Sequence, residues 1–189
     1  MASPGTGAHA HISIHSRNGE RKTREGLTSY EKSFLAGVLE HLQALAALAL
    51  PIPASFKRVA DGAFAGGTYV CWGSEKGELP ICLVNASYPA SRRFEMRFID
   101  ATANPYLVLA GILTAGIDGL RKRQELTMKS CTGTKHMSAE EREAFGITRH
   151  LPSTHQEART FFGENKLFRG AFGDDFVTKY LSVNKVCGL

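Results

Sequence analysis

Near its start the chain reads GAHAHISIH, which places three histidines at alternate positions. Successive side chains of a β-strand point to opposite faces, so His9, His11, Ser13 and His15 would share one face of a strand. The other face would carry alanine and isoleucine, which suits a protein core. Imidazole and hydroxyl groups bind metal ions and phosphates. The pattern also fits an exposed polar strand face, because two histidines alone do not make a metal site.

A second segment with chemistry-bearing side chains is RRFEMRF, at residues 92–98. Its alternation would place Arg93, Glu95 and Arg97 on one face of a strand and apolar side chains on the other. Because isolated buried charges are costly, these three side chains form either a solvated or internally ion-paired face, or the lining of a site. In a site, Glu95 would bind a hard cation such as Mg²⁺ or Mn²⁺. The two arginines would hold phosphate or carboxylate groups.

The two segments together would supply the parts of a phosphoryl-transfer site. His9 and His11 would join Glu95 around a metal ion, and the arginines would flank it, so that the charge on a moving phosphoryl group is neutralised. A metal-dependent hydrolase built on the same histidines is an alternative from another class. It would need further ligands near Glu95, but four later histidines lack ligand spacing and are predicted to lie on the surface: His41, His136, His150 and His155.

The strands that would carry these residues are separated by short turns. Besides the two segments above, TYVCW at residues 68–72 and LPICLV at residues 79–84 are predicted strands. Parallel strands need long crossover connections, so short turns favour antiparallel pairing. Because helices are interspersed, we expect an α+β fold in which helices pack on an antiparallel sheet.

Two long helices are predicted from their end signals and apolar periodicity. Thr28 and Glu31 form a capping box, and helical spacing of apolar residues continues until Pro51. Asn104 as N-cap and Pro105 at the first helical position begin a second helix, whose basic end at residues 121–123 suits the helix dipole. Shorter helices are predicted near residues 138, 153 and 174.

Composition narrows the class of protein. The 189 residues suffice for one domain, and the formal net charge of +5 suits an anionic ligand such as a nucleotide or a carboxylate. No basic run interleaved with aromatic residues points to nucleic acid. The four cysteines contain no CxxC pair, so we expect free thiols in a reducing compartment. Since neither a signal peptide nor a membrane span is evident, we expect a soluble, cytoplasmic protein without a membrane partner.

The motifs GTGAHAHISI, SFKRVADG, RRFEMRFIDATANPYLVLAGILTAGIDGL and the closing LP…DDFVTKYL carry a family resemblance. From the first residues to about Leu181, the chain resembles the C-terminal part of the glutamine synthetase catalytic domain. The segment DGAFAGGTYVCWG is most similar to the fungal glutamine synthetase-like branch. The resemblance implies a partial glutamine synthetase catalytic domain with ATP and Mg²⁺ or Mn²⁺ as cofactors.

The resemblance also implies a reaction and a role for each matched residue. Glutamate and ATP would form γ-glutamyl phosphate, from which ammonia or an amine displaces phosphate, in a closed site. The family forms large rings, so a homo-oligomer or co-assembly with full-length subunits is expected. The implied roles are metal binding for His9 and Glu95, ATP binding for His11, Ser13 and Arg93, substrate binding for Gly5, Arg58 and Arg97, and catalysis for Arg58 and Arg97.

Several positions differ from the family pattern. A small β-grasp domain and most metal-binding carboxylates normally precede the histidine strand, so residues 1–189 are expected to form the C-terminal part without the β-grasp domain. Phe64 stands where the family has a catalytic glutamate, Gly77 and Cys82 stand where it has arginines, and Pro4 replaces an asparagine. The alternative to a ligase is therefore a non-catalytic module or remnant that binds nucleotide weakly or assembles with full-length subunits.

Overall fold

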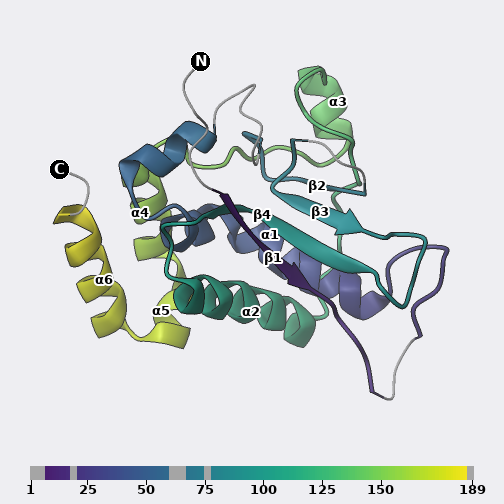
Figure 1. Cartoon of the computed structure of the whole chain (residues 1–189), viewed down its shortest axis with the longest axis horizontal. Coiled ribbons are helices and arrows are strands. Elements are labelled where there is room, and N and C mark those ends of the chain that lie inside the picture. Colours follow the sequence, from purple (N-terminus) through teal and green to yellow (C-terminus); the bar gives the residue numbers. More distant parts are fainter. Residues whose placement is uncertain (1–6, 18–20, 60–66, 75–77, 187–189) are drawn as a thin grey trace.

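The computed structural model describes residues 7–17, 21–59, 67–74 and 78–186 (Figure 1). Within these ranges the chain has the predicted α+β class. The strands are β1 (Gly7–Ile12), β2 (Trp72–Gly73), β3 (Ile81–Val84) and β4 (Arg93–Asp100). The helices are α1 (Ser29–Ala49), the 3₁₀ helix η1 (Pro53–Arg58), α2 (Pro105–Lys122), α3 (Ala139–Ala144), α4 (His155–Glu164), α5 (Lys166–Phe172) and α6 (Asp174–Val186). No helix in this part of the chain is long and apolar enough to cross a membrane.

The four strands form one mixed sheet in the order β1-β4-β3-β2. The interior strand β4 pairs antiparallel with both β1 and β3. The short connection between β3 and β4 predicts their antiparallel pairing, whereas β1 reaches β4 from across α1. The contact of β2 with β3 is parallel and covers two residue pairs, Trp72 with Ile81 and Gly73 with Cys82. Because this parallel pairing is so short, it forms without a helical crossover. The length of the turns therefore does not predict its direction.

Local sequence fixes where the two long helices begin. The Thr28 hydroxyl accepts a hydrogen bond from the Glu31 amide at 3.2 Å, and the Glu31 carboxylate accepts one from the Thr28 amide at 2.9 Å. At the start of α2, the Asn104 side-chain oxygen accepts hydrogen bonds from the first-turn amides of Tyr106 and Leu107. Both predicted caps are confirmed, and they satisfy amides that would otherwise lack partners.

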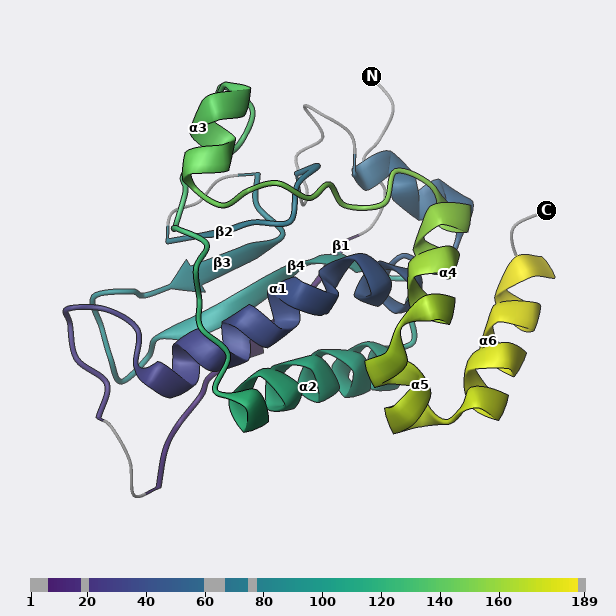
Figure 2. The same cartoon turned by 180° about the vertical axis from the view of Figure 1, so that it is seen from behind.

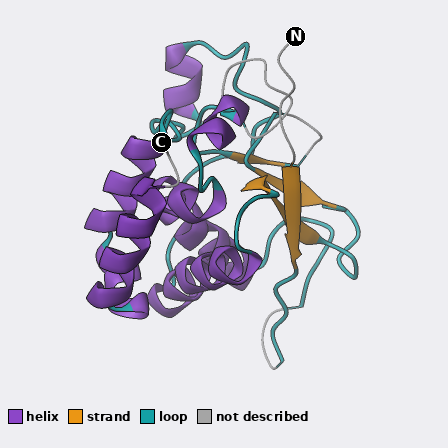
Figure 3. Cartoon of the chain, turned by 60° about the vertical axis from the view of Figure 1, so that its left-hand side comes forward, coloured by secondary structure: helices purple, strands orange, loops and turns teal. Residues whose placement is uncertain are grey.

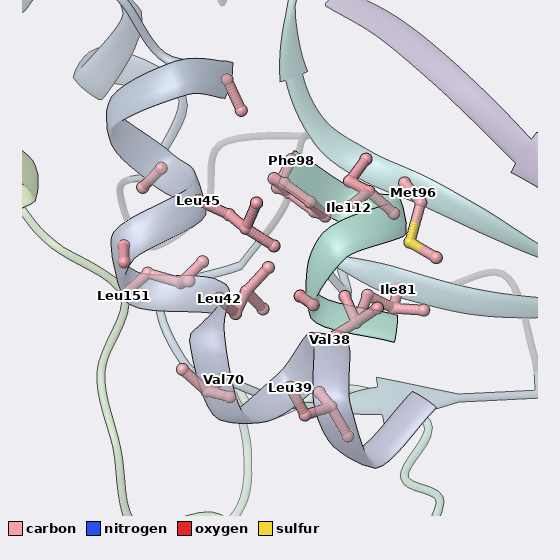
Figure 4. Close-up of a cluster of buried hydrophobic side chains, with 14 of the residues drawn as sticks. Val38, Leu39, Leu42, Leu45, Val70, Ile81, Met96, Phe98, Ile112 and Leu151 are labelled. Carbon is pink, nitrogen blue, oxygen red and sulfur yellow. The ribbon is translucent and has the colours of Figure 1, made fainter. Parts of the chain in front are cut away.

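The core lies between the sheet and α1, which crosses one face of the sheet with α2 beside it (Figure 2). Helices gather on this side of the sheet, and in the described part of the chain the opposite face carries none of the long helices (Figure 3). Alternate residues of the strands meet the apolar side of α1 because strand side chains have a period of two. The central side chains are almost fully buried: Val38, Leu42, Leu45, Ile81, Met96, Phe98 and Ile112 (Figure 4).

A buried ion pair attaches the beginning of β4 to the beginning of α1. Arg92, directly before β4, is 1% exposed, and its Nη2 and Nε lie 2.6 and 3.1 Å from the two carboxylate oxygens of Glu31. Lys22 Nζ approaches the same carboxylate at 3.3 Å, and Arg92 Nη1 donates to the Thr23 carbonyl at 2.7 Å. Because each charge has partners, the burial is tolerated. The pair fixes the end of the strand from which the charged side chains project.

Candidate functional site

The predicted chemistry-bearing side chains lie together on the sheet face that points away from α1. His9 and His11 of β1 are exposed, whereas the residues between and after them are half-buried. In β4, Arg93, Glu95 and Arg97 are half-buried, and the side chains between them are buried. His11 stands directly opposite Glu95 across the two strands. The alternation predicted from sequence is confirmed, and antiparallel pairing unites two segments more than 80 residues apart.

A β-bulge lies in the middle of this face. Ala8 pairs with Ile99, but Ala10 pairs with Met96, so two residues of β4 stand opposite His9. Such an extra residue increases the local twist and redirects side chains, and bulges are frequent beside functional sites. The redirected geometry lets Glu95 contact His9, its diagonal neighbour, more closely than His11, its direct partner. The sequence contains no pattern that marks this bulge.

Glu95 lies between the two histidines, and Arg93 adjoins the second one. Glu95 Oε1 is 2.8 Å from His9 Nδ1 and 4.0 Å from His11 Nε2. Arg93 Nε donates to His11 Nδ1 at 3.1 Å. An arginine can only donate, so His11 Nδ1 carries a lone pair and the neutral ring has its proton on Nε2. The His9 and His11 side chains are 40% and 41% exposed, so ligands can reach their ring nitrogens.

The remaining predicted residues of this face lie at its margins. Arg97 Nη1 is 3.8 Å from the Cys82 sulfur, and Cys82 pairs with Glu95 across β3 and β4. The Ser13 hydroxyl approaches the Arg92 carbonyl at 3.4 Å, one residue beyond the end of β1. Arg97 and Ser13 therefore border the histidine–glutamate cluster, which we define as His9, His11, Arg93 and Glu95.

Other predicted positions fall outside what the structure describes. Gly5 lies outside the described residues, as do the departures from the family pattern at Pro4, Phe64 and Gly77. Arg58 ends the 3₁₀ helix η1, but the position of its side chain is not described. The structure therefore shows the positions of Ser13 and of the five predicted side chains on the sheet face. It does not describe Gly5 or the Arg58 guanidinium.

Two of the later histidines differ from the surface placement predicted for them. His136 and His150 are exposed, but His41 and His155 are half-buried. His41 Nδ1 lies 3.0 Å from the side-chain nitrogen Nδ2 of Asn165, and His41 Nε2 lies 3.7 Å from a carboxylate oxygen of Asp118. Burial lowers the pKa of His41 despite the opposing charge of Asp118. None of these contacts joins the histidine–glutamate cluster, so they play a structural part in helix packing.

A cavity of about 480 Å³ adjoins the cluster at the outer edge of β1. His9 and His11 line one side of it, and Pro105, Val108 and Leu109 at the start of α2 line another. Sequence analysis missed the contribution of α2, because its apolar positions there follow the same helical period as core residues. The cluster thus borders a mostly apolar hollow large enough for part of a ligand.

The donor atoms of the cluster fit a divalent cation as part of its ligand set. Two atoms bound to one Mg²⁺ or Mn²⁺ at right angles lie about 3 Å apart, close to the separation of His9 Nδ1 and Glu95 Oε1. Within the described residues, no group of three or more His, Cys, Asp or Glu side chains could hold a metal ion. Since Mg²⁺ prefers six ligands, these two donors would need phosphate oxygens, water or further protein groups to complete the shell.

Known proteins share sequence with almost the whole of this chain. The family model described as "Glutamine synthetase, catalytic domain" matches residues 1–186. The chain is 34% identical over 182 residues to Protein fluG of Emericella nidulans, covering 96% of this chain and 19% of that protein. It is 32% identical over 186 residues to a glutamine synthetase of Staphylococcus aureus, covering 96% of this chain and 41% of that enzyme. The chain therefore spans less than half the length of these relatives.

The resemblance inferred from the histidine strand and the RRFEMRF segment is confirmed by these matches, including the similarity to a fungal relative. The match covers almost every residue of the chain, and the two segments that meet in the histidine–glutamate cluster both lie inside it. The chain belongs to the glutamine synthetase catalytic-domain family.

Proposed function

We propose that this chain forms the nucleotide-binding face of an ATP-dependent γ-glutamyl ligase of the glutamine synthetase type. Glutamate would react with ATP to give γ-glutamyl phosphate, and ammonia or an amine would then displace phosphate. The observation that supports this function best is the meeting of His9, Glu95, His11 and Arg93 on the open sheet face. Metal donors and anion-binding donors side by side are what phosphoryl transfer requires.

Each residue of the cluster would contribute according to whether its atoms bind a cation or donate to phosphate oxygens. His9 Nδ1 and Glu95 Oε1 would hold Mg²⁺ or Mn²⁺, which when bound supplies positive charge to the phosphates of ATP. The Nε2–H of His11 and the guanidinium of Arg93 can donate to phosphate oxygens, and the bond from Arg93 already fixes the His11 tautomer. Arg97, on the same face, would stabilise the charge that develops on the transferred phosphoryl group.

We further propose that a complete site forms by assembly, either in a homo-oligomer or with full-length subunits, in the cytoplasm. The chain spans 41% of the related Staphylococcus enzyme. The donor set on the described face is partial, and β1 is the outer strand of the sheet beside an apolar cavity. Unpaired strand edges and exposed apolar surface favour association. Such assembly would supply the remaining ligands of the cation.

Calorimetric titration of the purified chain with ATP, with and without Mg²⁺, tests this proposal. We expect binding that requires Mg²⁺ and falls at least about tenfold in His9→Ala and Glu95→Ala, because each variant removes one of two protein donors. His15→Ala is the matched control, since His15 lies beyond the end of β1 at Ile12. Its affinity should equal that of the unaltered chain.

Size-exclusion chromatography of the same samples separates loss of binding from loss of structure. A folded chain that binds no ATP at any Mg²⁺ concentration would contradict the proposed nucleotide-binding role. Equal binding by the His9, Glu95 and His15 variants would show that the nucleotide binds elsewhere. Binding that depends on the cluster would justify ligase assays with glutamate and candidate amines.

A further inference from the structure

The three cysteines that the structure describes gather at one end of the sheet, next to β2. Cys71, Cys82 and Cys131 are 0%, 4% and 5% exposed, and each is a free thiol. Sequence spacing does not predict this grouping, because Cys131 follows Cys71 by 60 residues and lies in the segment between α2 and α3. Burial alone would make them inert, so their mutual contacts decide what they can do.

Cys71 and Cys131 form a hydrogen-bonded thiol pair. Their side chains are hydrogen-bonded to each other, and Cys131 Sγ also lies 3.5 Å from the carbonyl oxygen of Trp72. The backbones are held side by side, because the Cys131 amide donates to the same carbonyl at 3.0 Å. The segment is anchored a second time where Trp72 Nε1 donates to the Met128 carbonyl at 3.1 Å. The two sulfurs are thus kept in contact by fixed backbone on both sides.

The missing side chain of Gly73 makes this close approach possible. A Cβ atom at Gly73 would lie 1.9 Å from the Cys131 carbonyl oxygen, so any larger residue would push the segment away from β2. Gly73 pairs with Cys82, and Cys82 contacts Arg97. The thiol pair is therefore close to the margin of the predicted ligase site but outside the histidine–glutamate cluster.

The two thiols are also unequal, as a reactive pair requires. The hydrogen bond from Cys71 lowers the pKa of the Cys131 thiol, although burial opposes this effect. The same contact and burial raise the pKa of Cys71. Cys82, whose sulfur lies 3.8 Å from Arg97 Nη1, is close enough to influence Cys71. The residues directly after Cys131, from 132 to 137, line a cavity of about 360 Å³ together with Glu78 and Glu141.

We propose that Cys71 and Cys131 are a redox modification site, which a hydroperoxide converts to a disulfide and a dithiol reductant restores. The Cys131 thiolate would attack one peroxide oxygen, the O–O bond would break, and Cys131 would become a sulfenic acid as hydroxide leaves. Cys71 sulfur would then bond to Cys131 sulfur, and the hydroxyl group would leave with the Cys71 proton as water. Two electrons pass from the thiol pair to the peroxide.

This inference does not rest on the proposed ligase function. It uses only contacts among β2, β3 and the segment that contains Cys131. Either proposal can therefore fail while the other stands.

Peptide mapping of the folded chain tests the pair directly, because trypsin places every cysteine in a separate peptide. Cys71, Cys82 and Cys131 fall in residues 59–76, 77–92 and 130–135, and Cys187 falls after Lys185. The folded chain is treated with hydrogen peroxide and then denatured in the presence of N-ethylmaleimide, which blocks the remaining free thiols. The non-reduced digest is then examined by mass spectrometry. We expect peptides 59–76 and 130–135 to be joined at least tenfold more often than any other pair.

Single variants and pH distinguish this mechanism from random oxidation. Cys71→Ser should leave Cys131 as a sulfenic acid that dimedone traps, Cys131→Ser should leave Cys71 reduced, and Cys82→Ser should keep the original cross-link. Between pH 6 and pH 8, an ordinary thiol with a pKa of about 8.5 gains roughly seventyfold in thiolate, whereas the rate for Cys131 should rise less than about thirtyfold.

Circular dichroism of each sample confirms that the fold is intact. The proposal is overturned if chain that was folded during peroxide treatment still has both thiols free to react with N-ethylmaleimide once it is denatured. It is equally overturned if residues 59–76 join residues 77–92 as often as residues 130–135, which is the pattern expected of unfolded chain.

Discussion

At the scale of single residues, two neighbouring arginines lie in opposite environments. Arg92 is buried against Glu31, and Arg93 lies on the open sheet face beside His11. The strand period predicts that they point to opposite sides, but the sequence does not reveal that Arg92 has a buried carboxylate as its partner. Glu31 is recognisable as the third residue of a capping box, yet its second role depends on a contact across 61 residues.

Glu31→Gln tests the buried ion pair. Burial alone would raise the pKa of the Glu31 carboxyl, but the hydrogen bonds and charges of Arg92, Thr28 and Lys22 outweigh burial and hold that pKa below its usual range. Its stabilising contribution is therefore present above the unfolded-state pKa of about 4.3 and is lost as pH falls through the folded-state value. At pH 7 the variant should lose about 3–5 kcal/mol of unfolding free energy, because Arg92 stays buried without its counter-charge.

Urea denaturation at several pH values measures this difference. The gap between the unaltered chain and Glu31→Gln should narrow as pH falls below about 4, because the Glu31 carboxyl of the unfolded chain then takes up a proton before that of the folded chain. Glu40→Gln is the control on the same helix. The Glu40 side chain is 54% exposed and meets Arg149 at 3.4 Å, so its loss should cost less than about 1 kcal/mol. A gap that stays constant down to pH 3 would contradict the assigned role of the Glu31 charge.

At the scale of elements, the fold depends on how closely α1 and α2 approach each other. A Cβ atom added at Gly119 of α2 would lie 2.2 Å from the Ser33 carbonyl oxygen of α1, and one added at Gly37 of α1 would lie 2.3 Å from the Ala115 carbonyl oxygen. Both added Cβ atoms would overlap backbone oxygen atoms, so no side-chain rotation relieves the overlap. The two glycines set the separation of the helices that support the sheet and its open face.

Gly119→Ala should lower the unfolding free energy by about 1–3 kcal/mol or more, because the added methyl group forces the helices apart. Gly170→Ala in α5 is the matched control, since nothing lies within 4 Å of the position that its Cβ would take. That variant should be neutral or stabilise the chain by about 0.4–1 kcal/mol, because alanine is the better helix former. Equal effects of the two substitutions, measured by thermal unfolding, would contradict the close helix contact.

Sequence signals predicted the elements well where they are long and locally encoded. The caps at Thr28 and Asn104 and the apolar period placed α1 and α2, and alternation placed β1 and β4. Three features are not local and could not be predicted this way. The bulge opposite His9 and the parallel contact of β2 depend on pairing with other strands. The third feature is the boundary between α4 and α5, which are separated by a single residue, Asn165.

At the scale of the whole molecule, one apolar surface remains open. Along α2, four large apolar side chains on one side of the helix are between 41% and 83% exposed, and the outer strand β1 and its cavity lie next to the helix start. A stripe of this kind is unusual for a lone domain and fits the proposed assembly. The stripe consists of Tyr106, Leu109, Leu113 and Ile117.

Family membership was accessible from sequence because its motifs are contiguous segments that carry site residues. The roles of individual residues were less accessible, since the Arg93 contact that sets the His11 tautomer needs three-dimensional placement. The sequence also could not predict which apolar surfaces stay exposed, for a different reason. The apolar period of α2 is the same whether its outer side meets solvent or another chain segment.

The most direct test of the central claim is nuclear magnetic resonance of the histidine side chains during titration with Mn²⁺ and ATP. Paramagnetic Mn²⁺ broadens nearby signals, so the imidazole resonances of His9 and His11 should broaden at substoichiometric Mn²⁺, ahead of that of the exposed His136 before α3. Glu95→Gln should abolish this selectivity, because it removes the carboxylate that holds the cation beside His9. Equal broadening of all the histidines, with or without Glu95, would contradict a metal–nucleotide site on the open sheet face.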